Sequence, residues 1–562
     1  MEHQKSPVDA EKEASRPLAD FPAGTGEDFL SAALSLSSDT DHSAREAYKE
    51  RLSSLKEQVK GLFTASKANH IESVKFIDTL CRLGVSYHFE KEIEEQLGKV
   101  FVSSDFHGII RGDECDLCTV GLAFQVFRQF GFNLSADVFD KFKDGKGKLK
   151  GNHGADAEGM LSLYEASQWR THGEDFLDES AVFSATILDG LASRCSLHLA
   201  TRIKNALKHP YHRGAPRIET RQYISYYEEE EMRDETLLEF AKVDFNVLQL
   251  LHLEELALVS RWYKDLRIES KVPYARRNRT AEAYFWALTI YFEPRYSRAR
   301  VTMAITLLVL TLVDDTYDAY GTIQELKLFT DALDRWLADA PYQLPDSIKH
   351  VYHIMVDFYD GLENELEKEK GRSGCGFHLK MSMKILGKSY YREAKWLEED
   401  YVATFDEYKE NGAFSSGAYA VVAASFAGMV DFGNLEAFEW LSSRPKPLQA
   451  AETIMRFMDD IAGHEMEHKR KHVGTAIDCY MKQYGVSKGE ATEEIRNMIS
   501  DSWKDLNEEL VTRPHTVPFP LLMRILNILR GTEVYYKYGD GYTEPERVKD
   551  YIVSLLGQNI PI

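Results

Sequence analysis

Apolar residues recur at intervals of three and four positions along most of the chain, which is the spacing of one buried helix face. An early example is the set Leu52, Leu55, Val59, Leu62 and Phe63. We find no convincing run of alternating apolar and polar residues that would indicate β-strands, and no repeat of fixed period that would indicate a solenoid. The pattern therefore predicts an all-α protein.

Two breaks interrupt the helical pattern and divide the chain. The segment 144–151 (DGKGKLKG) is rich in glycine and lysine, so we expect a loop there. A second break contains Pro210 and Pro216 and ends in the acidic run 228–231, which favours a domain boundary near residue 235. The expected division is a disordered segment at 1–15, an N-terminal helical domain at 16–235 and a C-terminal helical domain at 236–562.

Composition and charge exclude several classes of protein. The 562 residues include 68 Lys and Arg against 90 Asp and Glu, so the net charge of −22 argues against a nucleic-acid partner. The longest apolar run, Val301–Val313, is too short for stable membrane insertion. The N-terminal residues resemble neither a secretory signal nor a transit peptide, so we expect a cytoplasmic location. Six cysteines are too sparse for a disulfide framework, and the lone pair Cys115 and Cys118 lacks the second pair of a zinc site.

The run Val301–Val313 ends in an acidic cluster, DDTYD at 314–318. On a helix, Asp314 and Asp318 are four residues apart and project from one face as a pair of hard oxygen ligands. Mg²⁺ suits such a pair because it binds one or two carboxylates, retains several waters and completes its octahedron with phosphate oxygens. The alternative is a solvated helix end.

A second acidic row follows further along the chain. Asp459, Gly463 and Glu467 are spaced by four residues and share one helix face. Two acidic rows that face each other across a helical bundle form a metal cage. The pairing of the rows is therefore more informative than either row alone.

The same segment contains the zinc-protease pattern HExxH at 464–468. His464 and His468 lie a quarter-turn or more away from the Asp459 and Glu467 row, so the two rows cannot face one cavity equally. We find no obvious third histidine of the metzincin type, although Glu490 remains open as a third ligand. We expect both histidines to lie on a solvated face rather than in a zinc hydrolase site.

Cationic and aromatic residues lie upstream of the first acidic row. Arg277 and Arg279 are separated by one residue and suit a departing diphosphate, although an exposed basic turn is the alternative. Trp286 and its aromatic neighbours offer π faces that stabilise a carbocation, or they are ordinary core. The glycine-punctuated segment 537–542 is either a lid or a connector.

Together these motifs resemble the plant terpene synthases of the ionisation-initiated class, and in particular the cytosolic sesquiterpene synthases. Their order and spacing agree over nearly the whole chain. The matching blocks are 16–22 (RPLADFP), 209–214 (HPYHRG), 262–266 (WYKDL), 314–322 (DDTYDAYGT) and 540–546 (DGYTEPE).

The resemblance implies two helical-barrel domains, of which the N-terminal one is vestigial and the C-terminal one is catalytic. It implies three Mg²⁺ ions, with Mn²⁺ as a substitute, two carried by Asp314 and Asp318 and one by Asp459, Gly463 and Glu467. The other implied residues are Arg277, Arg279 and Arg456 for the diphosphate, Trp286, Ser415, Ser416, Gly417 and Tyr536 for the substrate pocket, and Asp540 and Tyr542 for the lid.

Three positions depart from the pattern of this family. Gly463 stands where the family usually has Ser or Thr as a metal ligand, and Gly26 stands where it has Trp. The stretch PYARRNR has one residue more than the usual PYARDR, so Arg276 is a rival to Arg277. The N-terminal half has no DxDD motif, so we expect no protonation-initiated cyclisation.

The resemblance implies Mg²⁺-dependent ionisation of farnesyl diphosphate, cyclisation of the allylic cation in an aromatic pocket, and release of a sesquiterpene and diphosphate by a monomer. The fifteen-carbon substrate is favoured because no plastid transit peptide is seen. The alternatives are a monoterpene synthase acting on geranyl diphosphate, a chain-elongating prenyltransferase and a catalytically inactive helical relative.

Overall fold

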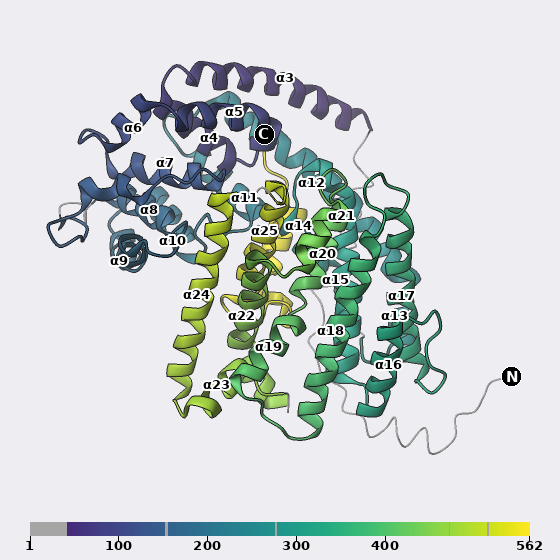
Figure 1. The fold of residues 1–562 in the computed structure, drawn as a ribbon. Helices are drawn as coiled ribbons and strands as arrows, with labels where there is room; N and C mark the ends of the chain where they lie inside the picture. Colours follow the sequence, from purple (N-terminus) through teal and green to yellow (C-terminus); the bar gives the residue numbers. More distant parts are fainter. Residues whose placement is uncertain (1–41, 152–155, 276–277, 471–472, 514–515) are drawn as a thin grey trace.

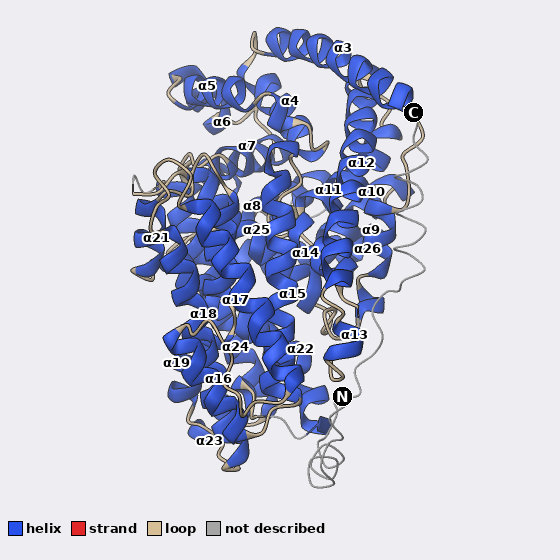
Figure 2. Ribbon diagram, turned by 90° about the vertical axis from the view of Figure 1, so that its right-hand side faces the viewer, coloured by secondary structure: helices blue, strands red, loops and turns tan. Residues whose placement is uncertain are grey.

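Helices form nearly all of the structure, a computed structural model that describes residues 42–151, 156–275, 278–470, 473–513 and 516–562. Within these ranges no β-strand is present, and only isolated bridges such as Lys143 with Leu149 occur (Figure 2). The predicted all-α class is confirmed. The segment 1–15, the block 16–22 and Gly26 lie outside the described residues.

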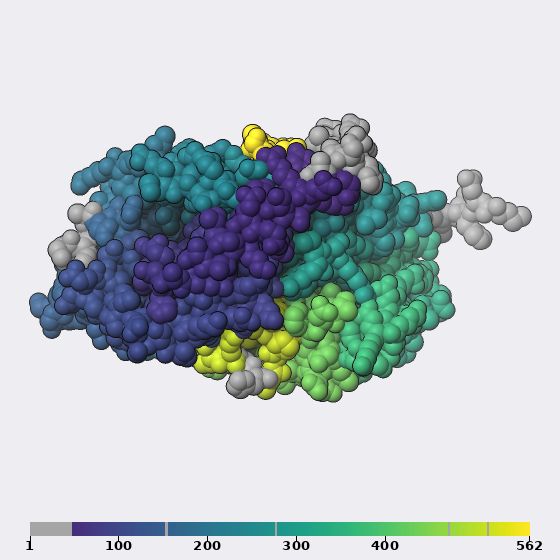
Figure 3. Space-filling view, turned by 90° about the horizontal axis from the view of Figure 1, so that it is seen from above, coloured from purple at the N-terminus to yellow at the C-terminus, as the bar shows by residue number. Residues whose placement is uncertain are grey.

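The N-terminal half is built from short helices, coloured purple to blue-teal in Figure 1. Their order is α3 (His42–Ser66), α4 (His70–Arg82), α5 (Glu90–Phe101), α6 (Ser104–Arg111), α7 (Leu117–Gln129), α8 (Ala157–Ser167), α9 (Asp175–Ala192), α10 (Leu197–Lys208) and α11 (Pro216–Glu228). Seen from above in Figure 3, the purple segment that begins with α3 lies across the surface of both halves.

The C-terminal half is a bundle of longer helices. They are α12 (Glu235–Asp265), α13 (Ile268–Lys271), α14 (Thr280–Ile290), α15 (Ser297–Ala319), α16 (Ile323–Arg335), α17 (Asp346–Leu366), α18 (Cys375–Glu398), α19 (Phe405–Ser415), α20 (Ala418–Gly428), α21 (Leu435–Ser442), α22 (Lys446–Arg470), α23 (Ala476–Tyr484), α24 (Lys488–Thr512), α25 (Phe519–Tyr536) and α26 (Lys549–Leu556). Figure 1 shows α22 flanked by α19 and α24.

Capping boxes fix where several helices of the bundle begin. In each box a Ser or Thr side chain accepts a backbone N–H of the first turn while an acidic side chain accepts the N–H of the cap. These boxes start α16 at Thr322, α19 at Thr404, α23 at Thr475 and α24 at Ser487. In the capping box that starts α23, the acidic partner of Thr475 is Asp478.

The two halves share one hydrophobic core. A continuous cluster of buried apolar side chains runs from Leu55 in α3 to Ile560 at the C-terminus, and a smaller cluster lies among α8, α9 and α10. Asn507 of α24 joins the halves, because its side-chain amide donates to the carbonyls of Gln168 and Arg170 at 3.0 and 2.8 Å. The predicted boundary near residue 235 lies at the first residue of α12.

The apolar run before the acidic cluster becomes a central helix. The segment Pro294–Ala319 is long and apolar enough to cross a membrane, but 72% of its apolar window is buried inside the protein. It packs against α12, α14, α17, α18 and α20. The sequence is apolar here because α15 is surrounded by other helices. The acidic residues 314–318 follow this apolar run at the C-terminal end of α15.

Candidate active site

The first acidic row lies at the C-terminal end of α15. Asp314 and Asp318 are exposed to solvent, whereas Asp315 is buried. Desolvation by the surrounding protein and the charges of Asp318 and Asp315 raise the pKa of Asp314 to about 8, against a smaller lowering effect of a hydrogen bond from Tyr390 of α18. The carboxylates therefore repel each other at a place where a cation would relieve the repulsion.

The second acidic row lies along α22. Asp459 is partly exposed, with 30% of its side chain accessible. Two turns further on, the carboxyl group of Glu467 lies beside Gly463, and a Cβ atom on Gly463 would stand 3.1 Å from Glu467 Oε1. The Glu467 carboxylate thus lies close against the space that a side chain at position 463 would enter.

One carboxylate of each row acts electrostatically on the other. The charge of Asp459 on α22 contributes to the raised pKa of Asp314 on α15. Burial, followed by the charges of Asp459 and Asp540, raises the pKa of Tyr536 well above its ordinary value. The C-terminal ends of α15 and α25, the middle of α22 and the loop after α25 therefore converge on one region.

The donor set of this region fits magnesium. Asp314, Asp318 and Asp459 offer hard carboxylate oxygens whose mutual repulsion a cation would relieve, and Glu467 offers a further carboxylate on α22. Gly463 supplies no side-chain ligand. Mg²⁺ usually retains several waters, so a water molecule can take the place of that ligand.

Arg456 lies one turn before this row and is held by both aspartates that follow it. Its guanidinium pairs with Asp459 and donates through Nε to Asp460 Oδ1 at 2.9 Å. Asp460 is buried and also accepts from the Tyr408 hydroxyl at 2.8 Å and from the Ala476 backbone N–H at 3.1 Å. Asp460 thereby links α22 to α19 and α23 while it orients Arg456.

Arg279 is buried and bonded to the loop after α25. Its guanidinium donates to the carbonyl of Tyr542 and, at 3.3 Å, to that of Thr543, and it stands 5.0 Å above the Tyr542 ring. The loop itself is held by Asp540, whose Oδ1 accepts the backbone N–H groups of Tyr542 and Thr543 at 2.9 and 2.8 Å. An exposed basic turn is therefore the wrong interpretation of Arg279. Arg276 and Arg277 lie outside the described residues.

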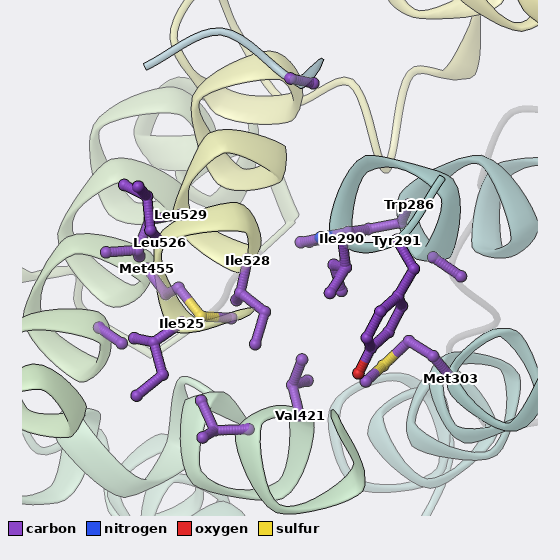
Figure 4. Close-up of a cluster of buried hydrophobic side chains, with 14 of the residues drawn as sticks. Trp286, Ile290, Tyr291, Met303, Val421, Met455, Ile525, Leu526, Ile528 and Leu529 are labelled. Atoms are coloured by element: carbon purple, nitrogen blue, oxygen red, sulfur yellow. The ribbon is translucent and has the colours of Figure 1, made fainter. Parts of the chain in front are cut away.

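Aromatic side chains line the junction between α14, α25 and this loop. Trp286 is buried and stacks on Tyr535 with ring centroids 4.5 Å apart, and the Tyr542 ring meets it edge-on at 5.5 Å. In Figure 4, Trp286, Ile290, Val421 and Ile528 point toward one another from α14, α20 and α25. Other buried residues of the cluster are Tyr291, Met303, Met455, Ile525, Leu526 and Leu529.

Comparisons with known proteins identify the family to which the chain belongs. Residues 26–207 match the terpene synthase N-terminal domain, and residues 264–505 match the metal-binding domain of the terpene synthase family. The chain is 60% identical to an alpha-humulene/(-)-(E)-beta-caryophyllene synthase from Arabidopsis thaliana over 98% of this chain and 100% of the relative. The chain belongs to the terpene synthase family. A valerianol synthase from Camellia hiemalis is 43% identical over 99% of this chain and 98% of its own.

Solved terpene synthases share the fold. Isoprene synthase from grey poplar, in complex with three Mg²⁺ ions and dimethylallyl-S-thiolodiphosphate, superposes with a TM-score of 0.85 at 31% identity, covering 92% of this chain and 98% of its own. A limonene synthase with 2-fluorolinalyl diphosphate gives a TM-score of 0.89 at 26% identity, covering 97% and 100%. This terpene synthase therefore carries the all-α cyclase fold over its described length.

The residues Ser415, Ser416 and Gly417, which the resemblance places at the substrate pocket, lie at a break between two helices of this terpene synthase. Helix α19 ends at Ser415 and α20 begins at Ala418. Gly417 has a φ of 72°, in the left-handed region where glycine is favoured, and the Ser416 Oγ accepts the backbone N–H of Ala418 at 3.1 Å. Ser415 Oγ donates to Glu393 of α18 at 2.5 Å.

The expectation for the two histidines of this terpene synthase is wrong for one of them. His464 is buried, because α23 covers it and its Nδ1 meets Thr475 Oγ1 at 2.9 Å, whereas His468 remains half-exposed. Glu490 caps α24 through Ser487 and is not placed with the histidines. Glu465, the would-be catalytic residue of a protease, is exposed and faces Lys488, so the structure gives a zinc hydrolase no support.

Sequence reasoning missed the residues that orient this site. Tyr390 contacts Asp314, Glu393 contacts Ser415, and Asp460 holds both Arg456 and Tyr408. The doublet Asp459–Asp460 could have indicated the role of Asp460. Neighbouring side chains on a helix point about 100° apart, so when Asp459 points toward the site Asp460 must point elsewhere. Tyr390, Glu393 and Tyr408 lie on other helices and gave no local signal.

Proposed function

We propose that this terpene synthase is a sesquiterpene cyclase, which ionises farnesyl diphosphate and cyclises the resulting allylic cation. The observation that carries the proposal is the pairing of two acidic rows, on α15 and α22, beside a buried aromatic and aliphatic cluster. The relatives named as humulene/caryophyllene, valerianol and hedycaryol synthases, 43–60% identical over almost the whole chain, support a fifteen-carbon substrate.

The site has a metal-binding side, which binds the diphosphate, and an apolar side, which surrounds the carbocation. Bound Mg²⁺ stabilises the negative charge that develops on the departing diphosphate. Asp314, Asp318, Asp459 and Glu467 would hold the ions, and Arg456 would bind diphosphate oxygens together with Arg279 and Arg277, for which Arg276 is the rival.

The apolar side protects the cation. The stacked faces of Trp286 and Tyr535 offer negative π density without a nucleophile that would capture it. The loop 540–544, held by Arg279 and by the hydrogen bond of 2.5 Å between Tyr542 and Thr311, excludes water while the cation exists. Carbonyl groups at the break near Gly417 face the same cation, and proton loss or water capture ends the reaction.

Further properties belong to the same proposal. We expect three Mg²⁺ ions, as in the complex of the poplar isoprene synthase, and Mn²⁺ as a substitute. We also expect a cytoplasmic monomer without stable membrane insertion or a nucleic-acid partner, which is consistent with the net charge of −22.

The direct test is incubation with farnesyl diphosphate and Mg²⁺ followed by mass-spectrometric identification of volatile products. Asp314→Asn should lower turnover by about 100-fold or more, because it removes a charge from the metal site. Asp346→Asn is the matched control, since Asp346 is fully exposed at the start of α17 and pairs with the nearby Lys349 at 3.2 Å. Turnover of Asp314→Asn at the wild-type rate would contradict the metal assignment.

The same assay separates the alternatives. Preferred turnover of geranyl diphosphate would indicate a monoterpene synthase, and longer prenyl diphosphates formed on addition of isopentenyl diphosphate would indicate a chain-elongating prenyltransferase. A folded protein that binds neither diphosphate more tightly with Mg²⁺, measured by calorimetry, would be an inactive relative.

A further inference from the structure

Three metal-ligating side chains meet behind the active site, where the C-terminal end of α22 contacts the first turn of α23. They are His464, His468 and Asp478, and one ligand atom from each lies within 4.8 Å of those of the other two. His468 Nε2 stands 3.2 Å from Asp478 Oδ1, and His464 Nδ1 stands 3.7 Å from Asp478 Oδ2. The two imidazole rings are 4.4 Å apart.

Hydrogen bonds orient His468 and Asp478 as a metal site requires, whereas His464 Nδ1 donates to Thr475 Oγ1 at 2.9 Å and leaves its other ring nitrogen, Nε2, for an ion. Metal-binding histidines typically donate their other ring N–H to a carbonyl or carboxylate, which fixes the tautomer. His468 Nδ1 lies 3.0 Å from the His464 carbonyl oxygen and can donate to it, which directs the Nε2 lone pair toward Asp478. Asp478 Oδ2 accepts from the backbone N–H and the hydroxyl of Thr475, each at 2.9 Å.

We propose that His464, His468 and Asp478 bind a transition-metal dication of the zinc type, distinct from the Mg²⁺ ions of the carboxylate rows. Two imidazole nitrogens and one carboxylate oxygen suit Zn²⁺, Co²⁺ or Ni²⁺ rather than Mg²⁺, and water completes the tetrahedron. The role we propose is structural, because Glu465, the acidic residue of the HExxH pattern, faces Lys488 instead of the histidines.

The position of the site determines its effect. Glu467 of the carboxylate row lies between His464 and His468 in the sequence of α22. Asp478 belongs to the capping box of α23. An ion held by all three residues fastens the last turn of α22 to α23, so it stabilises the helix end that carries Glu467 without contacting the substrate.

The test is calorimetric titration of the full chain with Zn²⁺ in saturating Mg²⁺, with the Co²⁺ absorption spectrum as a second readout. We expect one equivalent of Zn²⁺ and a tetrahedral Co²⁺ spectrum. His468→Gln should weaken Zn²⁺ binding about tenfold or more and abolish that spectrum. This variant should remain folded, because 55% of the His468 side chain is exposed, and circular dichroism checks this.

Two further variants complete the experiment. His172→Gln is the control, because His172 also pairs with a carboxylate, Asp505 at 3.1 Å, but belongs to no cluster of three ligands among the described residues. It should leave Zn²⁺ binding unchanged. Equal Zn²⁺ affinity of wild type and His468→Gln would overturn the proposal, as would Zn²⁺ binding that Asp314→Asn abolishes, since the ion would then occupy the carboxylate rows.

Discussion

Replacement of Asp460 by Asn tests whether the two neighbouring aspartates of α22 have different tasks. Asp460 is 1% exposed and its carboxylate accepts hydrogen bonds from Arg456, Tyr408 and the backbone of Ala476. An asparagine keeps the shape of the side chain but loses the charge and turns one acceptor into a donor. That donor would point at groups that are donors themselves.

The cost follows from these contacts. Removal of one partner from a buried ion pair costs about 3–5 kcal/mol, because the other charge remains buried. Arg456 keeps Asp459 as a second partner, so we expect the lower end, about 3 kcal/mol of unfolding free energy. Asp459→Asn is the matched variant: its side chain is 30% exposed, so its loss should change the unfolding free energy by less than about 1 kcal/mol.

Urea denaturation followed by circular dichroism measures the change in unfolding free energy. The Mg²⁺ concentration at half-maximal turnover measures the effect of each substitution on metal binding. Asp460→Asn should lower the urea midpoint, whereas Asp459→Asn should keep the midpoint and raise the Mg²⁺ requirement. Equal midpoints for wild type and Asp460→Asn would refute the assignment of Asp460 as a structural anchor. A larger loss of stability in Asp459→Asn than in Asp460→Asn would refute the division of tasks.

Three other substitutions test separate parts of the structure. Gly531→Ala should cost about 1–3 kcal/mol in urea denaturation and alter the product spectrum, because its Cβ would lie 2.8 Å from Trp286 Nε1. Burial and the charge of a neighbouring glutamate raise the pKa of Glu219 to about 8, so the contribution of Glu219 to stability should fall by up to about 1.4 kcal/mol per pH unit between pH 4.5 and 8. Glu219→Gln should make the unfolding free energy fall less steeply with pH, and the remaining slope includes Asp314, whose pKa is also raised to about 8. Gly463→Ser should lower the Mg²⁺ concentration for half-maximal turnover by adding a ligand oxygen, provided that Glu467 yields at the 3.1 Å contact, and an unchanged requirement would contradict a ligand role for this position.

Local spacing made the fold class and the faces of the acidic helices predictable. The four-residue spacing of Asp314 and Asp318 depends only on helix geometry, and it holds within α15. The surroundings of Arg279 depend on Tyr542, which is 263 residues away, so no local pattern announced its bond to the loop. The burial of His464 was missed for the same reason, because it results from the packing of α23 against the end of α22.

The two aspartate doublets, 314–315 and 459–460, share one arrangement of exposed and buried side chains. Residue type alone could not predict it, because a candidate metal ligand and a buried structural residue are both aspartates. Successive helix residues point about 100° apart, so the two members of a doublet cannot face the same neighbour. Asp314 and Asp459 are accessible, and the charge of Asp459 acts on Asp314, whereas Asp315 and Asp460 are 3% and 1% exposed and lie within the bundle. The buried member is stable only where partners surround it, as Arg456 and Tyr408 surround Asp460. Each doublet therefore combines a solvent-facing carboxylate that a cation can reach with a second that is fixed within the bundle.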